Sequence, residues 1–283
     1  MVSYDGTKYA GFQYQKSGTS IQELLENALQ IVVREHTRVD CAGRTDSGVH
    51  ATGQVATFLS PVAPDPGKLT YSLNSLLPFD VSVQKSLNMP RNFHPRFSCI
   101  AREYEYMYHI GARSPFWRGR SWHRKKGFEI EEINQELAAI CGHRDFIALT
   151  KTLYEGKGTV RYLDSAVLYR KEDPWTGHGD MIVLRVRANA FLHNMIRILA
   201  GTIVDRAAGK LSSITDAVLS GSRFKTGQTA PSEGLYFRHA FYVPGTAPGL
   251  KELALPDDHP LMRIHAGRMR SSREGDQENH AKE

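Results

Sequence analysis

An arginine and an aspartate lie two residues apart in a glycine-rich stretch, and both side chains could take part in chemistry. The stretch CAGRTDSGVHATGQVATF runs from Cys41 to Phe58 and contains Arg44 and Asp46. Its glycines and polar residues disfavour a helix. Because it follows an apolar run and ends in QVATF, it is typical of a loop between two strands. An isolated Thr-Asp-x-Gly is more often a simple turn, so the rest of the sequence must decide.

Segment 113–126 combines cations with aromatic rings. Its sequence, RSPFWRGRSWHRKK, contains no acidic residue, and Phe116, Trp117 and Trp122 lie between the basic ones. Cations bind phosphates and aromatic rings stack on bases, so the pattern favours a nucleic-acid surface. A solvated loop whose aromatics are tucked into the core is the alternative. The residues expected to contact nucleic acid are Arg118, Arg120, Arg124 and Lys125.

The composition is that of an ordinary globular protein with a small positive charge. The chain has 283 residues, of which 41% are hydrophobic and 23% charged, enough for one large domain or two smaller ones. Its 36 Lys and Arg against 30 Asp and Glu give a net charge of +6, a weak hint of an anionic partner. No apolar run reaches the ~18 residues of a membrane span, and no secretion signal begins the chain. We therefore expect no membrane association.

The cysteines and histidines argue against a metal site. The three cysteines, Cys41, Cys99 and Cys141, are far apart, which disfavours disulfides and zinc and favours a reducing, cytoplasmic location. None of the twelve histidines forms an H-x-x-x-H or H-E-x-x-H pair, and no phosphate-binding glycine motif is present. We expect neither a metal nor a cofactor, and we expect His50 to be a packing residue.

The hydrophobic pattern predicts alternating strands and helices. Ser20 and Glu23 form a capping box before a helix over 20–36, and a long alternating strand is expected over 99–110. That strand places Arg102 and Tyr104 on one face with the tyrosines that follow. Further helices are expected near 68–77, 129–141 and 189–208 and from Ser212 or Ser213. Further strands are expected near 1–4, 38–42, 54–59, 80–87, 158–170, 181–188 and within 234–243.

This order predicts an α+β fold made of two ferredoxin-like (RRM-like) halves. Each half reads strand, helix, strand, strand, helix, strand. The expected halves are 1–92, which carries the Asp46 loop, and 93–244. Residues 245–283 lack periodicity and are expected to form a mobile tail. Because Met1 lies directly inside the first expected strand, we also expect residues to precede it.

Five stretches together resemble the tRNA pseudouridine synthases of the TruA family. They occur in the family's order and span most of residues 1–243. The stretches are YDGTKYAGFQ (4–13), GRTDSGVHATGQ (43–54), FHPRFSCIAREYEY (93–106), NAFLHNMIRILAGTI (189–203) and EGLYF (233–237). The resemblance implies joined antiparallel sheets with helices on one side and an active cleft between the halves. It also implies a homodimer that isomerises uridine at tRNA positions 38, 39 and 40.

The resemblance assigns roles to individual residues. Asp46 matches the essential aspartate, which either attacks the sugar or removes a proton from it. Arg197 matches the arginine that pairs with that carboxylate, and Tyr104 the tyrosine that lies against the target base. Arg44 matches the arginine that helps displace the base, and Leu235 lines the pocket. The alternative is a non-catalytic protein of the same fold that binds or folds RNA.

Overall fold

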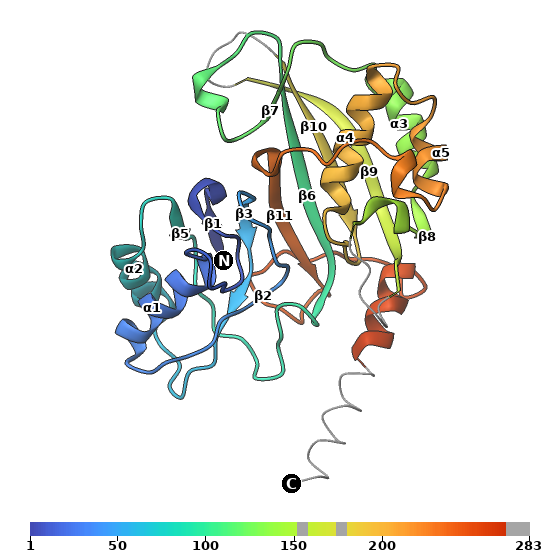
Figure 1. Cartoon of the computed structure of the whole chain (residues 1–283). Coiled ribbons are helices and arrows are strands. Elements are labelled where there is room, and N and C mark those ends of the chain that lie inside the picture. Colours follow the sequence, from blue (N-terminus) through green and yellow to red (C-terminus); the bar gives the residue numbers. More distant parts are fainter. Residues whose placement is uncertain (152–157, 174–179, 270–283) are drawn as a thin grey trace. The chain divides into compact units, whose positions relative to one another are not determined.

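The computed structural model describes residues 1–151, 158–173 and 180–269, and it is a mixed α/β protein with a large, mostly antiparallel sheet (Figure 1). Its residues divide into two compact units. Unit 1 comprises Met1–Asp46, Ala51–Arg102 and Arg238–Glu283, and unit 2 comprises Ser47–His50 and Glu103–Phe237. These units are interleaved along the chain, so they differ from the expected halves 1–92 and 93–244. The ferredoxin-like arrangement of each half stays a prediction.

Unit 1 contains short strands and the helices α1 and α2, and its last described residues, 260–269, are also helical. Strand β1 pairs antiparallel with β3 and with β5, and β2 pairs with β4. Helix α1 packs beside α2 (Figure 1). The elements are β1 (Val2–Tyr4), α1 (Ile21–Val33), β2 (Asp40–Cys41), β3 (His50–Gln54), β4 (Ala56–Thr57), α2 (Pro66–Leu76) and β5 (Val81–Val83).

Helix α1 forms where the sequence predicts it. The Ser20 hydroxyl accepts a hydrogen bond from the Glu23 N–H at 3.1 Å, and the Glu23 carboxylate accepts one from the Ser20 N–H, so the capping box is complete. Ile21, Leu25 and Leu29 are buried on its inner face. The helix ends at Val33 rather than near residue 36, because Arg34 adopts a left-handed conformation with φ 58°.

Unit 2 contains the longer strands. Strand β9 pairs antiparallel with β8 and β10, and β7 pairs parallel with β6. Strands β6 and β11 each have residues in both units. The elements are β6 (Cys99–Ile110), β7 (Trp122–Arg124), α3 (Ile130–Ala139), β8 (Gly142–Asp145), β9 (Val160–Glu172), β10 (Asp180–Ala188), α4 (Met195–Ala207), α5 (Ile214–Leu219) and β11 (Leu235–Tyr242).

Side-chain hydrogen bonds attach helices of unit 2 to its strands. The Asn134 amide of α3 donates to the Leu168 carbonyl of β9 at 2.9 Å and accepts from the Leu168 N–H at 2.7 Å. The Tyr108 hydroxyl of β6 donates to the Ala200 carbonyl of α4 at 3.0 Å. These bonds hold α3 against β9, and α4 against β6, the strand that carries Tyr104.

Other expected elements also have different bounds. Helix α4 begins at Met195 rather than residue 189, because Asn194 is left-handed at φ 61° and interrupts the helical conformation there. The strand expected at 54–59 is divided into β3 and β4. The chain before α4 is therefore irregular, although its sequence is apolar enough for a helix.

Residues 245–269, at the start of the expected mobile tail, contain buried side chains and backbone hydrogen bonds. Ala247 and Leu261 are fully buried, and the Leu253 N–H donates to the Tyr242 carbonyl at 3.0 Å. Burial of these apolar side chains attaches the segment to unit 1 although it lacks periodicity. Residues 270–283 lie outside the described residues.

Candidate active site

The loop that carries Asp46 is held by buried partners within unit 1. The Phe12 N–H donates to the Thr45 carbonyl at 3.0 Å, and the Tyr4 and Thr45 hydroxyls share a hydrogen bond of 2.8 Å. Burial raises the pKa of the Tyr4 phenol, so this hydroxyl stays neutral. Arg44 is exposed and Asp46 is half-buried. Thr45, the residue between them, is therefore anchored. This restricts the positions that the Asp46 side chain can reach.

A buried arginine supports the same loop from strand β6. The Arg102 side chain is almost fully buried; its Nε donates to the Ala42 carbonyl at 3.1 Å and its Nη1 to the Cys99 carbonyl at 3.3 Å. Its Nη2 also donates to the Arg96 carbonyl. One guanidinium suits such a role, because its N–H groups form a rigid, positively charged fork. From the sequence, Arg102 is expected on the tyrosine face of the strand and has no assigned role. The sequence feature that could have indicated a role is a charged residue within a strand that is buried along its whole length.

The residues that follow Asp46 pack within unit 2. Gly48 has φ 76°, a conformation that favours glycine, and a Cβ there would lie 2.6 Å from the Ser232 hydroxyl oxygen, which would have to move. The His50 ring is buried, with Nε2 3.1 Å from the Glu233 carbonyl, and it stacks on Tyr236 at 4.6 Å. This confirms the prediction that His50 is a packing residue.

Tyr104 is buried between two phenylalanines. Its ring makes edge contacts with Phe191 at 5.2 Å and with Phe237 at 5.0 Å, all three in unit 2. Tyr106 and Tyr108 are fully buried on the same strand. Their hydroxyls are engaged, since that of Tyr106 donates to the Pro231 carbonyl at 2.9 Å. Burial raises the pKa of both.

Arg197 is held in one orientation by its neighbours. Its Nε donates to the Ala230 carbonyl at 2.8 Å and its Nη1 to the Asn194 side-chain oxygen at 2.8 Å. One turn further along α4, a Cβ on Gly201 would lie 1.7 Å from the Gln228 carbonyl oxygen. Only glycine at position 201 lets the backbone at Gln228 pass so close to α4. Two residues later the same segment supplies the Ala230 carbonyl that accepts from Arg197.

Leu235 is buried at the start of β11. The preceding Gly234 packs on Tyr106, because a Cβ on Gly234 would lie 2.6 Å from that ring. Leu235 therefore belongs with Tyr104 and Arg197 to unit 2, whereas Arg44 and Asp46 belong to unit 1. Its role in lining a pocket stays a prediction.

Comparisons with known proteins address what this arrangement is for. A family model described as tRNA pseudouridine synthase matches residues 1–98 and 137–243. The chain belongs to this family. It is 37% identical over 244 residues to tRNA pseudouridine synthase A of Ruminiclostridium cellulolyticum, covering 85% of this chain and 97% of the relative. It is 39% identical over 250 residues to that of Leptospira biflexa (86% and 92%) and 38% identical over 247 residues to that of Bacillus licheniformis (85% and 97%).

The family match covers some of the predicted site residues and not others. Asp46, Arg197 and Leu235 lie in the matched ranges, as does Arg44. Tyr104 lies between them, in residues 99–136, and so does the whole of segment 113–126. The assignment of these residues therefore rests on their own physical properties and on the local resemblance.

The basic segment of this family member presents cations on the surface of unit 2. Arg118, Arg120 and Lys125 are exposed, and the Arg124 guanidinium lies over the Trp122 ring at 5.0 Å. The Tyr236 hydroxyl fixes the segment by donating to the Arg120 carbonyl at 2.7 Å. The aromatics differ in exposure, because Phe116 is 57% exposed whereas Trp122 packs on Tyr106 and Tyr108. Binding of nucleic acid by this segment stays a prediction.

Across the described residues, no cluster of three or more His, Cys, Asp or Glu side chains is placed to hold a metal ion. Within the same ranges, every helix is too short or too polar to cross a membrane.

Proposed function

We propose that this protein converts uridine to pseudouridine in the anticodon stem-loop of tRNA, at positions 38, 39 and 40. The observation that carries the proposal is the family match over residues 1–98 and 137–243, which includes the loop of Asp46 and the helix of Arg197. The anchored loop supports it further, because a catalytic group must be held in a productive geometry.

Asp46 is the proposed catalytic residue. Conversion of uridine to pseudouridine breaks the bond between the sugar and N1 of the uracil, and a new bond then joins the sugar to C5 of the turned base. A carboxylate can attack the anomeric carbon or take a proton from the neighbouring sugar carbon. Either role needs the ionised form of Asp46. The proton displaced from C5 must also leave, which is the step that the Tyr104 hydroxyl is proposed to assist.

Other residues are proposed to bind the target nucleotide. The Tyr104 ring stacks on the uracil, and its two aromatic neighbours keep it in one orientation. A uridine within a stem must leave its stack to react, and the exposed Arg44 side chain is suited to occupy the vacated place. Leu235 contributes an apolar surface. We further propose that the enzyme acts in the cytoplasm as a homodimer without metal or cofactor.

The experiment that tests the function uses unmodified tRNA transcripts. Incubation with the purified protein should place pseudouridine at positions 38, 39 and 40 where these are uridines, as read by chemical mapping. Transcripts with cytidine at the same three positions serve as controls and should show none. A protein that binds the transcripts and leaves every uridine unchanged would instead be the non-catalytic RNA-binding alternative.

Arg197→Lys should damage turnover although it conserves charge. Lysine cannot reproduce the planar fork that donates to Ala230 and Asn194, so the cation would lose its orientation. Loss of one or two charged hydrogen bonds predicts a single-turnover rate roughly 10- to 100-fold lower. The measurement compares that rate with tRNA affinity for the same variant. Poor tRNA binding with a normal rate at saturation would make Arg197 an RNA contact instead.

A further inference from the structure

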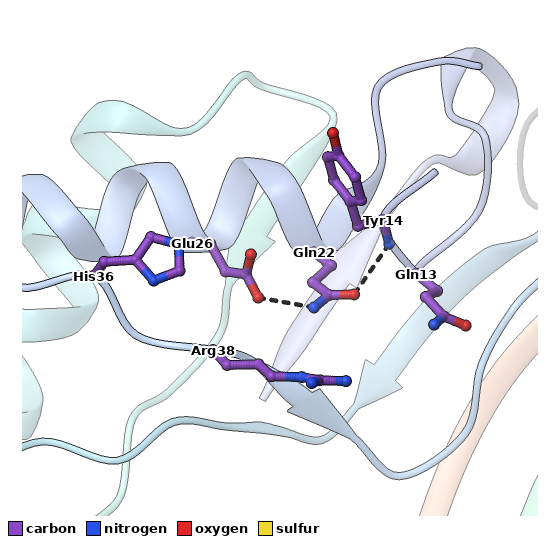
Figure 2. A pocket seen from close by; sticks show the side chains of 6 residues that line it. All are labelled: Gln13, Tyr14, Gln22, Glu26, His36 and Arg38. Carbon is purple, nitrogen blue, oxygen red and sulfur yellow. Dashed lines mark hydrogen bonds between the residues drawn. The ribbon is translucent and has the colours of Figure 1, made fainter. Parts of the chain in front are cut away.

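A polar pocket of about 300 Å³ lies on one side of helix α1, within unit 1 (Figure 2). The loop before the helix contributes Gln13 and Tyr14 to its lining, and the segment after the helix contributes His36 and Arg38. In Figure 2 the Arg38 side chain runs along the same side of α1 as Gln22 and Glu26, and the Tyr14 ring stands beyond Gln22. The pocket thus has a cation at one side and an aromatic ring at the other.

The floor of the pocket is a rigid chain of hydrogen bonds. The Gln22 side-chain oxygen accepts from the Tyr14 N–H at 3.0 Å, and its amide donates to Glu26 Oε1 at 2.8 Å. Glu26 Oε1 also accepts from the Val39 N–H at 2.9 Å. One glutamine and one glutamate therefore tie the loop before α1 to the segment after it. The walls that carry Tyr14 and Arg38 are fixed before any ligand binds, which lowers the entropic cost of binding.

The groups at the rim suit a nucleotide. Tyr14 is 55% exposed, although a tyrosine gains stability from burial, and its ring can stack on a base. Arg38 is exposed and can bind a phosphate. Both bonds to Glu26 use Oε1, so among the hydrogen bonds of the described residues Oε2 is the oxygen left to accept from a base amino group. An aromatic ring, a carboxylate and a guanidinium match the base, its polar edge and the phosphate of one nucleotide.

The pocket is connected to the loop of Asp46 by two backbone hydrogen bonds in unit 1. The Gln22 N–H donates to the Phe12 carbonyl at 2.8 Å, and the Phe12 N–H donates to the Thr45 carbonyl at 3.0 Å. A ligand held between Tyr14 and Arg38 therefore lies against the same framework that positions Asp46. This favours a part of the RNA substrate as the occupant over an unrelated small molecule.

We propose that the pocket lined by Tyr14, Glu26 and Arg38 binds an unpaired nucleotide of the tRNA substrate outside the target uridine. The base stacks on Tyr14 with its amino group toward Glu26, which favours adenine, cytosine or guanine over uracil, and the phosphate binds Arg38. This inference rests on the proposed function for the identity of the RNA. It adds a binding subsite that is separate from segment 113–126.

The test measures tRNA affinity as a function of salt for two variants with matched controls. Tyr14→Leu should weaken binding roughly 5- to 100-fold through lost stacking, with an unchanged salt slope. Arg38→Gln should flatten the slope of log affinity against log salt by about 0.7 to 0.9, the loss of one phosphate contact. The controls are Tyr71→Leu and Lys68→Gln, exposed residues of α2 in the same unit, and both should match the wild type.

A photocrosslink gives an independent readout. Replacing Tyr14 with p-benzoylphenylalanine should give a light-dependent crosslink to one region of the tRNA, and the same replacement of Tyr71 should give none. Variants that equal their controls, together with no crosslink at position 14, would overturn the proposal. The proposal would also be overturned if free AMP, CMP or GMP saturated the pocket and left tRNA affinity unchanged, because a tRNA nucleotide would then not occupy it. Because binding is measured apart from pseudouridine formation, an inactive wild-type protein would contradict the proposed function and leave this test intact.

Discussion

Asp46→Asn is expected to leave the fold intact and to lower turnover by ~10³-fold or more, as loss of an essential catalytic group typically does. Asparagine is nearly isosteric with aspartate, and the Thr45 carbonyl and hydroxyl would keep their bonds to Phe12 and Tyr4. The amide, however, is neither a nucleophile nor a base. The measurement is the single-turnover rate of pseudouridine formation at saturating tRNA.

The control for this variant is Asp40→Asn. Asp40 is an exposed carboxylate on β2, six residues before Asp46, and its neighbour is His94 at 4.0 Å. The same chemical change there should leave the rate within about twofold of the wild type, since surface ion pairs contribute little. The tRNA affinity of Asp46→Asn should persist, because phosphate contacts lie elsewhere. Residual activity of the variant within tenfold of the wild type would contradict the assignment of Asp46.

Removal of the basic segment should act on binding and spare the chemistry. A stem-loop is larger than an active site, so most of its affinity must come from phosphates outside that site. Each lost phosphate contact should flatten the slope of log affinity against log salt by roughly 0.7 to 0.9, so four should flatten it by about 3. The KM should rise, and the single-turnover rate at saturating tRNA should stay close to the wild type. The variant replaces Arg118, Arg120, Arg124 and Lys125 together by alanine.

A second fourfold alanine variant separates specific contacts from net charge. Like the variant of segment 113–126, this second variant removes four positive charges from unit 2, and all four are at exposed positions. The two variants therefore carry the same net charge. If both flatten the slope equally, the effect is one of overall charge; if neither does, segment 113–126 is a solvated loop or the phosphates bind other residues. Circular dichroism should show that the variant of segment 113–126 is folded, because it removes the packing of Arg124 on Trp122. The second variant, which is the control, replaces Arg144, Lys171, Lys210 and Lys225 by alanine.

Local patterns in the sequence predicted most elements of this protein. Helix α1 follows from Ser20, Glu23 and an apolar spacing of three and four, because helix caps and faces depend on residues within one turn of each other. Strand β6 follows in the same way from alternation over 99–110, with both its bounds correct. The five family-like stretches, and with them Asp46 and Arg197 as candidate site residues, were also visible in the chain alone.

The tertiary structure decided what depends on contacts between distant parts of the chain. Arg102 binds the Ala42 carbonyl 60 residues away, and Gly201 makes room for the backbone of Gln228. Leu261 attaches a segment without periodicity to unit 1. A periodic pattern records which face of an element is apolar, and it carries no information on which distant backbone meets that face. For this reason the sequence predicted the catalytic candidates, and the fold alone identified the buried arginine and the glycine that hold them in place.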